Sequence, residues 1–206
     1  MQTQFVPPEW AFEFHGHRCP FMPIGYRMGR LAMNALGAER EADHGFHVFP
    51  ELGEGHPQTC MMDGIQVVTG ATYGKVLMSK THFGKLAATF HHPTRGSVRL
   101  ALRPEFVDAM GKFEFFAYRK RGLEPSAIPV SITEEVIAWV AGQPDAAVFK
   151  IESKPDFHFT PIKGSFNKTL CSSCGEYVFD RYVRMKEGQP VCIPCSGYPS
   201  DIVPRS

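Results

Sequence analysis

The chain has 206 residues, of which 43% are hydrophobic and 21% are charged, and its formal net charge is +1. This composition is typical of a globular protein with one medium-sized domain and room for a small second module. The balanced charge excludes a strong overall attraction to nucleic acid, and no apolar run approaches the ~20 residues that span a bilayer. The first ten residues, MQTQFVPPEW, lack the basic and apolar segments of a signal peptide, so we expect a cytoplasmic protein.

Apolar residues recur at helical spacing in several segments, and the chain has no internal repeat. The last of the expected helices should begin at a capping box formed by Ser131 and Glu134. Gly64 counts against the second helix, because glycine costs about 1 kcal/mol in a helix interior. The expected helices are residues 20–36, 58–69, 104–121 and 131–141.

Other segments have the pattern of β-strands. The sequence Pro-Thr-Arg-Gly at 93–96 separates two of them and predicts the turn of a hairpin. The chain is therefore expected to mix helices and strands. The expected strands are residues 46–49, 86–92, 97–103 and 148–153.

Residues 154–168 are polar and contain two prolines and a glycine, so they are expected to form a linker. This linker would divide the chain into a core domain, residues 1–153, and a small C-terminal module, residues 169–206. In the module, apolar residues alternate on both sides of Lys186 to Gly188, which predicts a β-hairpin.

Two Cys-x-x-Cys pairs in this module are the strongest chemical signal in the chain. Cys171 pairs with Cys174 and Cys192 pairs with Cys195, at the spacing of a four-thiolate zinc site. Gly175 follows the first pair and can adopt the positive φ that such a turn needs. Disulfides are disfavoured because nothing marks the chain as secreted, and a redox pair would not come in duplicate. We therefore predict a structural zinc ion bound by all four cysteines.

A second group of metal ligands or proton-transfer side chains comes just before the first expected helix. His15, His17 and Cys19 lie within five residues of one another in the sequence His-Gly-His-Arg-Cys-Pro. Cys19 would lie at the N-terminus of the helix, where the dipole and free N–H groups stabilise a thiolate. This group could bind a soft metal or act as a nucleophile. The alternative is a histidine-rich turn whose cysteine packs as a small apolar residue.

Cys60 and Asp63 belong to the second expected helix, at a spacing that places them on one face. If the two helix starts meet, Cys60 and His56 would join the first group around one metal ion or substrate. Asp63 could then orient one of the histidines. A buried packing role is the alternative for Cys60.

These residues together resemble the FmdE family, named after the FmdE component of the tungsten or molybdenum formylmethanofuran dehydrogenase. The resemblance extends over roughly residues 5–150 and rests on the order of several motifs along the chain. The matching segments are FHGHRCPFMPIGYRMGRLA at 14–32, CMMDGIQVVTGATYGK at 60–75 and FGKLAATF at 83–90.

The resemblance implies an α+β fold, with a sheet flanked by helices, and a homodimer. It also implies a shared polar cluster that forms a metal or active site, with His17 and Cys19 as the catalytic candidates. Some members of the family carry a C-terminal zinc finger of the treble-clef type, and residues 169–197 resemble that module. Ala71 departs from the pattern, since many members have a cysteine there. The residues of the implied cluster are His15, His17, Cys19 and Cys60.

The sequence leaves three hypotheses of function open. In the first, the core binds a transition metal or handles a molybdenum or tungsten cofactor, as an accessory or partner of a formylmethanofuran dehydrogenase-like or formate-oxidising complex. In the second, the finger recognises nucleic acid or protein and the core senses a small ligand. The third is a stand-alone enzyme with a Cys/His site. The residues that would serve the second are Lys163, Lys168, Arg181, Arg184 and Lys186, interleaved with Tyr177, Phe179 and Tyr182.

Overall fold

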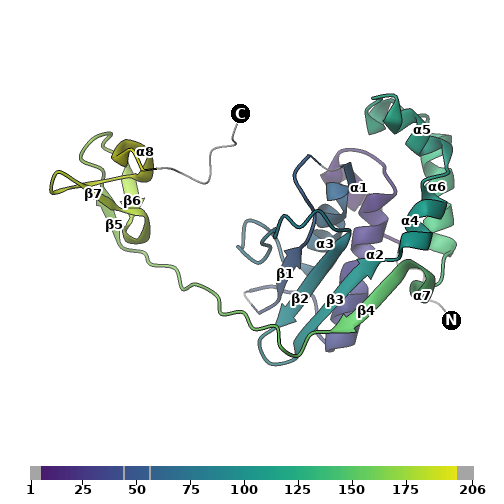
Figure 1. The fold of residues 1–206 in the computed structure, drawn as a ribbon, viewed down its shortest axis with the longest axis horizontal. Coiled ribbons are helices and arrows are strands. Elements are labelled where there is room, and N and C mark those ends of the chain that lie inside the picture. Colours follow the sequence, from purple (N-terminus) through teal and green to yellow (C-terminus); the bar gives the residue numbers. More distant parts are fainter. Residues whose placement is uncertain (1–5, 44, 56, 199–206) are drawn as a thin grey trace. The chain divides into compact units, whose positions relative to one another are not determined.

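The computed structural model describes residues 6–43, 45–55 and 57–198 and divides into two compact units. The first unit is Met1–Phe159 and the second is Thr160–Ser206. Both combine helices with antiparallel strands, which confirms the expected α+β class (Figure 1). No helix within the described ranges is long and apolar enough to cross a membrane.

A four-stranded antiparallel sheet in the order β1-β2-β3-β4 underlies the first unit (Figure 1). Successive residues of a strand point to opposite faces, so Val48, Phe90 and Leu100 enter the core. His91 and Arg99 lie on the opposite face. The predicted hairpin and final strand are confirmed, whereas the first strand begins and ends one residue later than expected. The strands are β1 (His47–Pro50), β2 (Ala87–His92), β3 (Gly96–Leu102) and β4 (Phe149–Ser153).

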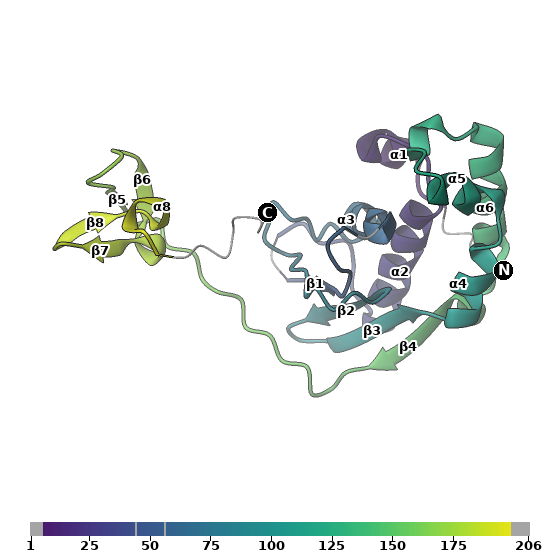
Figure 2. The ribbon, with the colours of Figure 1, turned by 45° about the horizontal axis from the view of Figure 1, so that its top comes forward.

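Helices α2 and α3 pack against each other over one face of this sheet (Figure 2). The first predicted helix is confirmed as α2. The second begins as a 3₁₀ turn, Pro57–Cys60, and continues as α3. Helix α1 was not expected from the sequence. The helices of this unit are α1 (Glu9–His15), α2 (Phe21–Leu36), α3 (Met61–Thr69), α4 (Pro104–Met110), α5 (Glu114–Lys120), α6 (Val130–Gly142) and α7 (Asp145–Val148).

Glycines at the contact between α2 and α3 let the two backbones approach closely. A Cβ atom on Gly64 would lie 2.2 Å from the carbonyl oxygen of Met22, and one on Gly25 would lie 1.9 Å from that of Met61. Neither position has room for a side chain, because the atoms in the way belong to the backbone. Gly64 is therefore a packing residue inside an intact helix.

Arg27 ties α2 to the C-terminal end of α6 from a position that is only 8% exposed. Its guanidinium lies 2.5 Å from Asp145 Oδ1 and donates to the carbonyl oxygens of Gln143, at 2.6 Å, and Val140, at 3.2 Å. Carbonyl groups in the last turn of a helix lack partners within the helix. Arg27 donates to two carbonyl groups at this end of α6 and holds the helix against α2.

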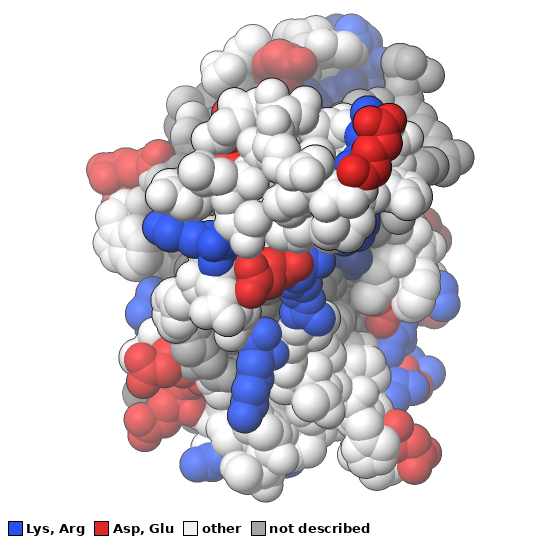
Figure 3. Space-filling view, turned by 90° about the vertical axis from the view of Figure 1, so that its left-hand side faces the viewer, with Lys and Arg blue, Asp and Glu red and all other residues white. Residues whose placement is uncertain are grey.

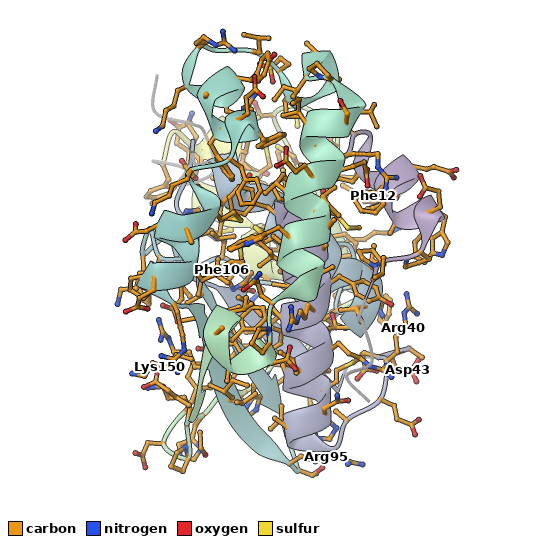
Figure 4. The ribbon with its side chains drawn as sticks, turned by 90° about the vertical axis from the view of Figure 1, so that its right-hand side faces the viewer. Phe12, Arg40, Asp43, Arg95, Phe106 and Lys150 are labelled. Atoms are coloured by element: carbon orange, nitrogen blue, oxygen red, sulfur yellow. The ribbon has the colours of Figure 1, made fainter. Side chains whose placement is uncertain are left out.

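The prediction of a single helix over 104–121 is wrong, because the chain forms two helices, α4 and α5. The break leaves Phe113 with an extended backbone, at ψ 147°. In this conformation the ring of Phe113 lies 5.2 Å from that of Trp139, while Phe115 is buried against the core. Phe106 stacks on the same tryptophan at 5.2 Å, between α4 and α6 (Figure 4). Burial of aromatic rings on both sides of the break outweighs continuous helical hydrogen bonding.

Helix α6 begins one residue before the predicted start and without the predicted capping box. Pro129 occupies the N-cap position with φ −52°, and no side chain makes a capping hydrogen bond there. Ser131 lies inside the first turn, so the prediction of its capping role is wrong. The fixed φ of proline suits this position at the start of the helix.

The chain that follows β4 packs on the second face of the sheet. The ring of Phe159 lies 4.7 Å from that of His47 and 4.9 Å from that of Phe49. Phe157 lies 5.2 Å from Phe49 and 5.9 Å from His91. Both histidines are buried, so these aromatic residues shield part of the sheet that the helices leave uncovered.

The second unit contains two small hairpins and a short helix. The hairpin predicted around Lys186 to Gly188 is confirmed. Its buried apolar core is very small: Val178 and Val191 pack with Cys171. The elements are β5 (Lys168–Leu170), β6 (Tyr177–Phe179), β7 (Arg184–Lys186), β8 (Gln189–Val191) and α8 (Ile193–Ser196).

We expect Gly64→Ala to destabilise the first unit by about 2–3 kcal/mol, because its Cβ atom would overlap the α2 backbone and force the helices apart. Gly142→Ala is the control, since a Cβ atom at Gly142 meets nothing within 4 Å. It should change the free energy of unfolding by less than about 1 kcal/mol.

Urea unfolding with a chelator present measures the free energy of unfolding of both variants. Tryptophan fluorescence reports the first unit alone, since Trp10 and Trp139 are the two tryptophans of the chain. Equal stability of the two variants would contradict the packing argument.

Candidate metal centres

The first candidate centre lies where the start of α2, the start of α3 and the end of α1 meet. His15 is the last residue of α1, and Gly16 ends that helix in the left-handed conformation, with φ 87°. This turn places His17 beside the start of α2, where Cys19 directly precedes the N-cap residue Pro20. Cys60 is the N-cap residue of α3. The predicted meeting of the two helix starts is therefore observed.

Four side chains converge there, and we call His15, His17, Cys19 and Cys60 the core cluster. Their ligand atoms all lie within 4.8 Å of one another. The Nε2 atoms of His15 and His17 are 3.2 Å apart, and Cys19 Sγ lies 3.6 Å from His15 Nε2. Cys60 Sγ lies 4.0 Å from His17 Nε2. His56, which was expected near this group, lies outside the described residues.

Asp63 makes the contact with a histidine that the sequence suggested. Its Oδ2 atom lies 2.7 Å from Nδ1 of His15, whose side chain is only 6% exposed. When the neutral ring donates Nδ1–H to this carboxylate, as it would with a metal ion bound, Nε2 carries the free lone pair and faces the other members of the core cluster. Histidine ligands of metals are commonly oriented in this way by a carboxylate.

The charges in the core cluster are shared between His15 and Cys60. The hydrogen bond to Asp63 is the main cause that raises the pKa of His15 to about 9. The pKa of Cys60 is lowered to about 4, mainly by a hydrogen bond from the Cys19 thiol and to a smaller extent by His15. Burial acts in the opposite direction and raises this pKa. Cys19 donates to Cys60 and is buried, so its own pKa is raised. Without a metal ion, the arrangement is a Cys60 thiolate beside a His15 imidazolium.

His17 is the neutral base of the core cluster. Burial is the main cause that lowers its pKa, and the positive charge of His15 lowers it further. A neutral imidazole has a lone pair with which to bind a metal ion or accept a proton. The structure thus gives different protonation states to the two histidines, although the sequence places them only two residues apart.

Two nitrogen and two sulfur donors within this space fit a tetrahedral ion that accepts soft ligands, such as Zn²⁺. These four donors complete a tetrahedral set without any ligand from Ala71. Ala71 is fully buried in the hydrophobic core and contributes no ligand. The chemistry of the donors and the fixed tautomer of His15 both suit metal binding.

The second candidate centre comprises Cys171, Cys174, Cys192 and Cys195, which we call the finger cluster. Their sulfur atoms lie within 4.8 Å of one another. Backbone N–H groups, first that of Cys174 and then that of Cys192 at 3.3 Å, donate to Cys171 Sγ and lower the pKa of Cys171 to about 6. Gly175 has φ 75°, as expected for the residue that follows the first pair. Four sulfur donors around one point are able to hold a metal ion in a closed tetrahedral site.

Sequence reasoning missed Gln66, which links Asp63 to the chain beyond α3. Its side-chain amide lies 3.1 Å from Asp63 Oδ1 and 2.9 Å from the backbone nitrogen of Tyr73. The spacing of three residues between Asp63 and Gln66 on one helix could have indicated the first contact. The second depends on how the chain after Gly70 folds back, which residue spacing does not show.

Comparison with known proteins agrees with this architecture. A protein of Archaeoglobus fulgidus named "Probable S-adenosyl-L-methionine-binding protein" is 31% identical over 201 residues, which cover 91% of this chain and 51% of that protein. The chain thus spans about half the length of this curated relative. The crystal structure of a protein from Syntrophus aciditrophicus that resembles FmdE of a tungsten formylmethanofuran dehydrogenase has a TM-score of 0.57. It is 22% identical, and the match covers 92% of this chain and 89% of that one, which shows a common fold.

The family assignment rests on the part of the chain that carries the core cluster. A family model described as "FmdE, Molybdenum formylmethanofuran dehydrogenase operon" matches residues 14–150. This range includes both helix starts, the glycines between them and the whole four-stranded sheet except the last residues of β4. The chain belongs to the FmdE family.

Proposed function

We propose that this protein is a metal-binding accessory protein of the FmdE type, with one ion in the core cluster and a structural zinc ion in the finger cluster. The observation that carries the proposal is the convergence of four soft or borderline donors at two helix starts, with Asp63 holding His15 in the tautomer that a metal requires. His15, His17, Cys19 and Cys60 would hold the core ion.

The ion in the finger cluster would serve to fold the second unit. The first cysteine pair lies in the turn of the β5–β6 hairpin, the β7–β8 hairpin follows, and α8 carries the last cysteine in its first turn, an order that would suit a treble clef. Its apolar core is too small to stabilise a fold of this length without help. Four thiolates leave no open position for a substrate, so zinc is expected to be structural there.

The accessory role is supported by the description of the family, which places FmdE in a molybdenum formylmethanofuran dehydrogenase operon. In this proposal the core ion or its thiolates handle a metal or metal cofactor for a molybdenum or tungsten dehydrogenase of that type. Full-length protein, as a tagged bait, should retain subunits of such a dehydrogenase from a native extract. A variant with both Cys19→Ser and Cys60→Ser, as the matched bait, should retain less.

The metal content of the full chain tests the proposal directly. We expect two ions per chain after loading with Zn²⁺ and gel filtration, measured by plasma mass spectrometry. Cys19→Ser combined with Cys60→Ser should remove one ion, since it leaves only the two imidazoles of the core cluster. Cys174→Ser should remove the finger ion and spare the core ion.

The two sets of variants control for each other, because the same substitution is made in different clusters. If the wild-type chain holds one ion and the variant of the core cysteines still holds it, the core cluster does not bind metal and the proposal fails.

Soft-metal binding at neutral pH needs a thiolate, and the protonation state of Cys60 can be tested in metal-free protein. Because its pKa lies near 4, Cys60 stays ionised from pH 6 to pH 8, and its alkylation rate should be nearly constant over this range. An ordinary thiol would react roughly 75-fold faster at pH 8 than at pH 6.

Peptide mass spectrometry distinguishes the alkylation of Cys60 from that of the buried Cys19. Asp63→Asn should slow alkylation at pH 6, because His15 then loses the partner that favours its positive charge. Ordinary pH dependence in the wild-type protein would contradict the assignment.

A second candidate function is supported by the outer face of the β5–β6 hairpin. Tyr177 and Phe179 are 64% and 49% exposed, and cross-strand pairing places Lys168 and Leu170 on the same face. Lys168 Nζ lies 4.4 Å from the ring centre of Tyr177. Exposed aromatic rings beside cations are able to stack on bases of single-stranded nucleic acid. Figure 3 shows acidic and basic side chains interspersed over the face toward the viewer.

If the finger binds single strands, a fluorescent oligonucleotide should bind at low salt, with an affinity that falls as salt rises because phosphate contacts release counterions. Tyr177→Ala combined with Phe179→Ala should weaken binding by roughly 1–3 kcal/mol per lost stacked base. Tyr73→Ala, which removes an exposed tyrosine of the first unit, is the control. No binding at low salt would exclude this function for the finger. A small ligand of the core is a separate hypothesis, for which the name of the archaeal relative suggests S-adenosylmethionine.

A further inference from the structure

Both ends of the Gln66 amide are engaged, and their partners fix its orientation. The backbone N–H of Tyr73 is a donor, so the atom that it meets at 2.9 Å must be the amide oxygen. The amide nitrogen then faces Asp63 Oδ1, at 3.1 Å, and donates to it. The same carboxylate accepts from His15 through its other oxygen, Oδ2. A continuous chain of hydrogen bonds thus runs from the Tyr73 backbone to a ligand of the core cluster.

The segment at the far end of this chain is the 70–76 loop, which follows α3. Tyr73 and Val76 are about three-quarters exposed, at 76% and 75%. Val76 has φ 59°, a left-handed conformation that is strained for a β-branched residue. Lys75 anchors the loop by donating to the carbonyl oxygens of Glu41, at 3.0 Å, and Ala42, at 3.2 Å. Strain of this kind persists where the surrounding contacts hold the chain in place.

We propose that Gln66 is a positioning residue, which holds Asp63 against His15 and fastens the 70–76 loop to α3. The inference deepens the proposed function and rests on it, since it concerns the metal affinity of the same site. Asp63 keeps 34% of its side chain exposed, so burial alone does not fix the carboxylate. The Gln66 donor occupies Oδ1 and thereby leaves Oδ2 directed at His15. Metal affinity in the core therefore depends on a loop that contributes no ligand.

Two substitutions separate the two bonds of Gln66. Gln66→Glu keeps an oxygen that can accept from Tyr73 N–H but loses the donor to Asp63. Gln66→Met has a similar length and loses both bonds. The control, Asn34→Asp, makes the same amide-to-carboxylate change on an exposed residue of α2.

The first measurement is Co²⁺ affinity of the core cluster, in full-length protein whose finger cluster holds zinc, by chelator competition and the thiolate-to-cobalt absorption bands. Both Gln66 variants should bind Co²⁺ about tenfold or more weakly, as for other groups that orient metal ligands. Asn34→Asp should bind as the wild type does. An added carboxylate would by itself attract the cation, so weaker binding in Gln66→Glu points to lost positioning.

The second measurement is hydrogen exchange at the Tyr73 amide. Exchange should be faster in Gln66→Met and close to wild type in Gln66→Glu, because only the latter keeps the acceptor. Wild-type Co²⁺ affinity in both Gln66 variants would overturn the positioning role, and unchanged Tyr73 exchange in Gln66→Met would overturn the link to the loop. Absence of Co²⁺ binding in the wild-type core would overturn the proposed function itself, and this inference with it.

Discussion

The backbone contact between α2 and α3 is the constraint on which the rest of the first unit depends. Gly25 and Gly64 leave no room for a Cβ atom, so the two helices lie closer than side chains would allow. This proximity brings the starts of both helices together, and each start carries a cysteine. The junction therefore sets the two cysteines side by side, where the Cys19 thiol donates to the Cys60 thiolate. Close packing of the helices and the chemistry of the site therefore have one cause.

In the core cluster, the positive charge of His15 lies between the negative charges of Cys60 and Asp63. The Cys60 thiolate receives the Cys19 proton donor and the His15 cation, while Asp63 compensates the imidazolium from the other side. A metal ion that enters would replace the shared protons as the positive partner of both thiolates. Asp63 would then keep His15 in the same orientation. The site is thus organised for a cation before one is bound, which lowers the reorganisation that binding requires.

The fold of the second unit depends on its four cysteines more than on apolar packing. Among its described residues, the buried apolar core consists of Val178, Val191 and Cys171, and a core of this size does not offset the entropy of ordering the chain. Four cysteines with lone pairs directed at one point supply the missing stabilisation when an ion is bound. The first unit, in contrast, has a large hydrophobic core and does not need an ion for its fold. An empty finger cluster would therefore destabilise the second unit, whereas an empty core cluster would leave the first unit folded.

The sequence by itself determined the finger cluster, because each Cys-x-x-Cys turn is local, and most helices and strands, because periodicity is local too. It also indicated that Cys19 and Cys60 would stand at helix starts. Only the tertiary structure decided that these starts meet and that 104–121 breaks so that Phe113 can reach Trp139. It also decided that Gln66 reaches both Asp63 and Tyr73. The reason is that such contacts join distant segments, whose approach is set by the packing of glycines and aromatic rings across the whole unit.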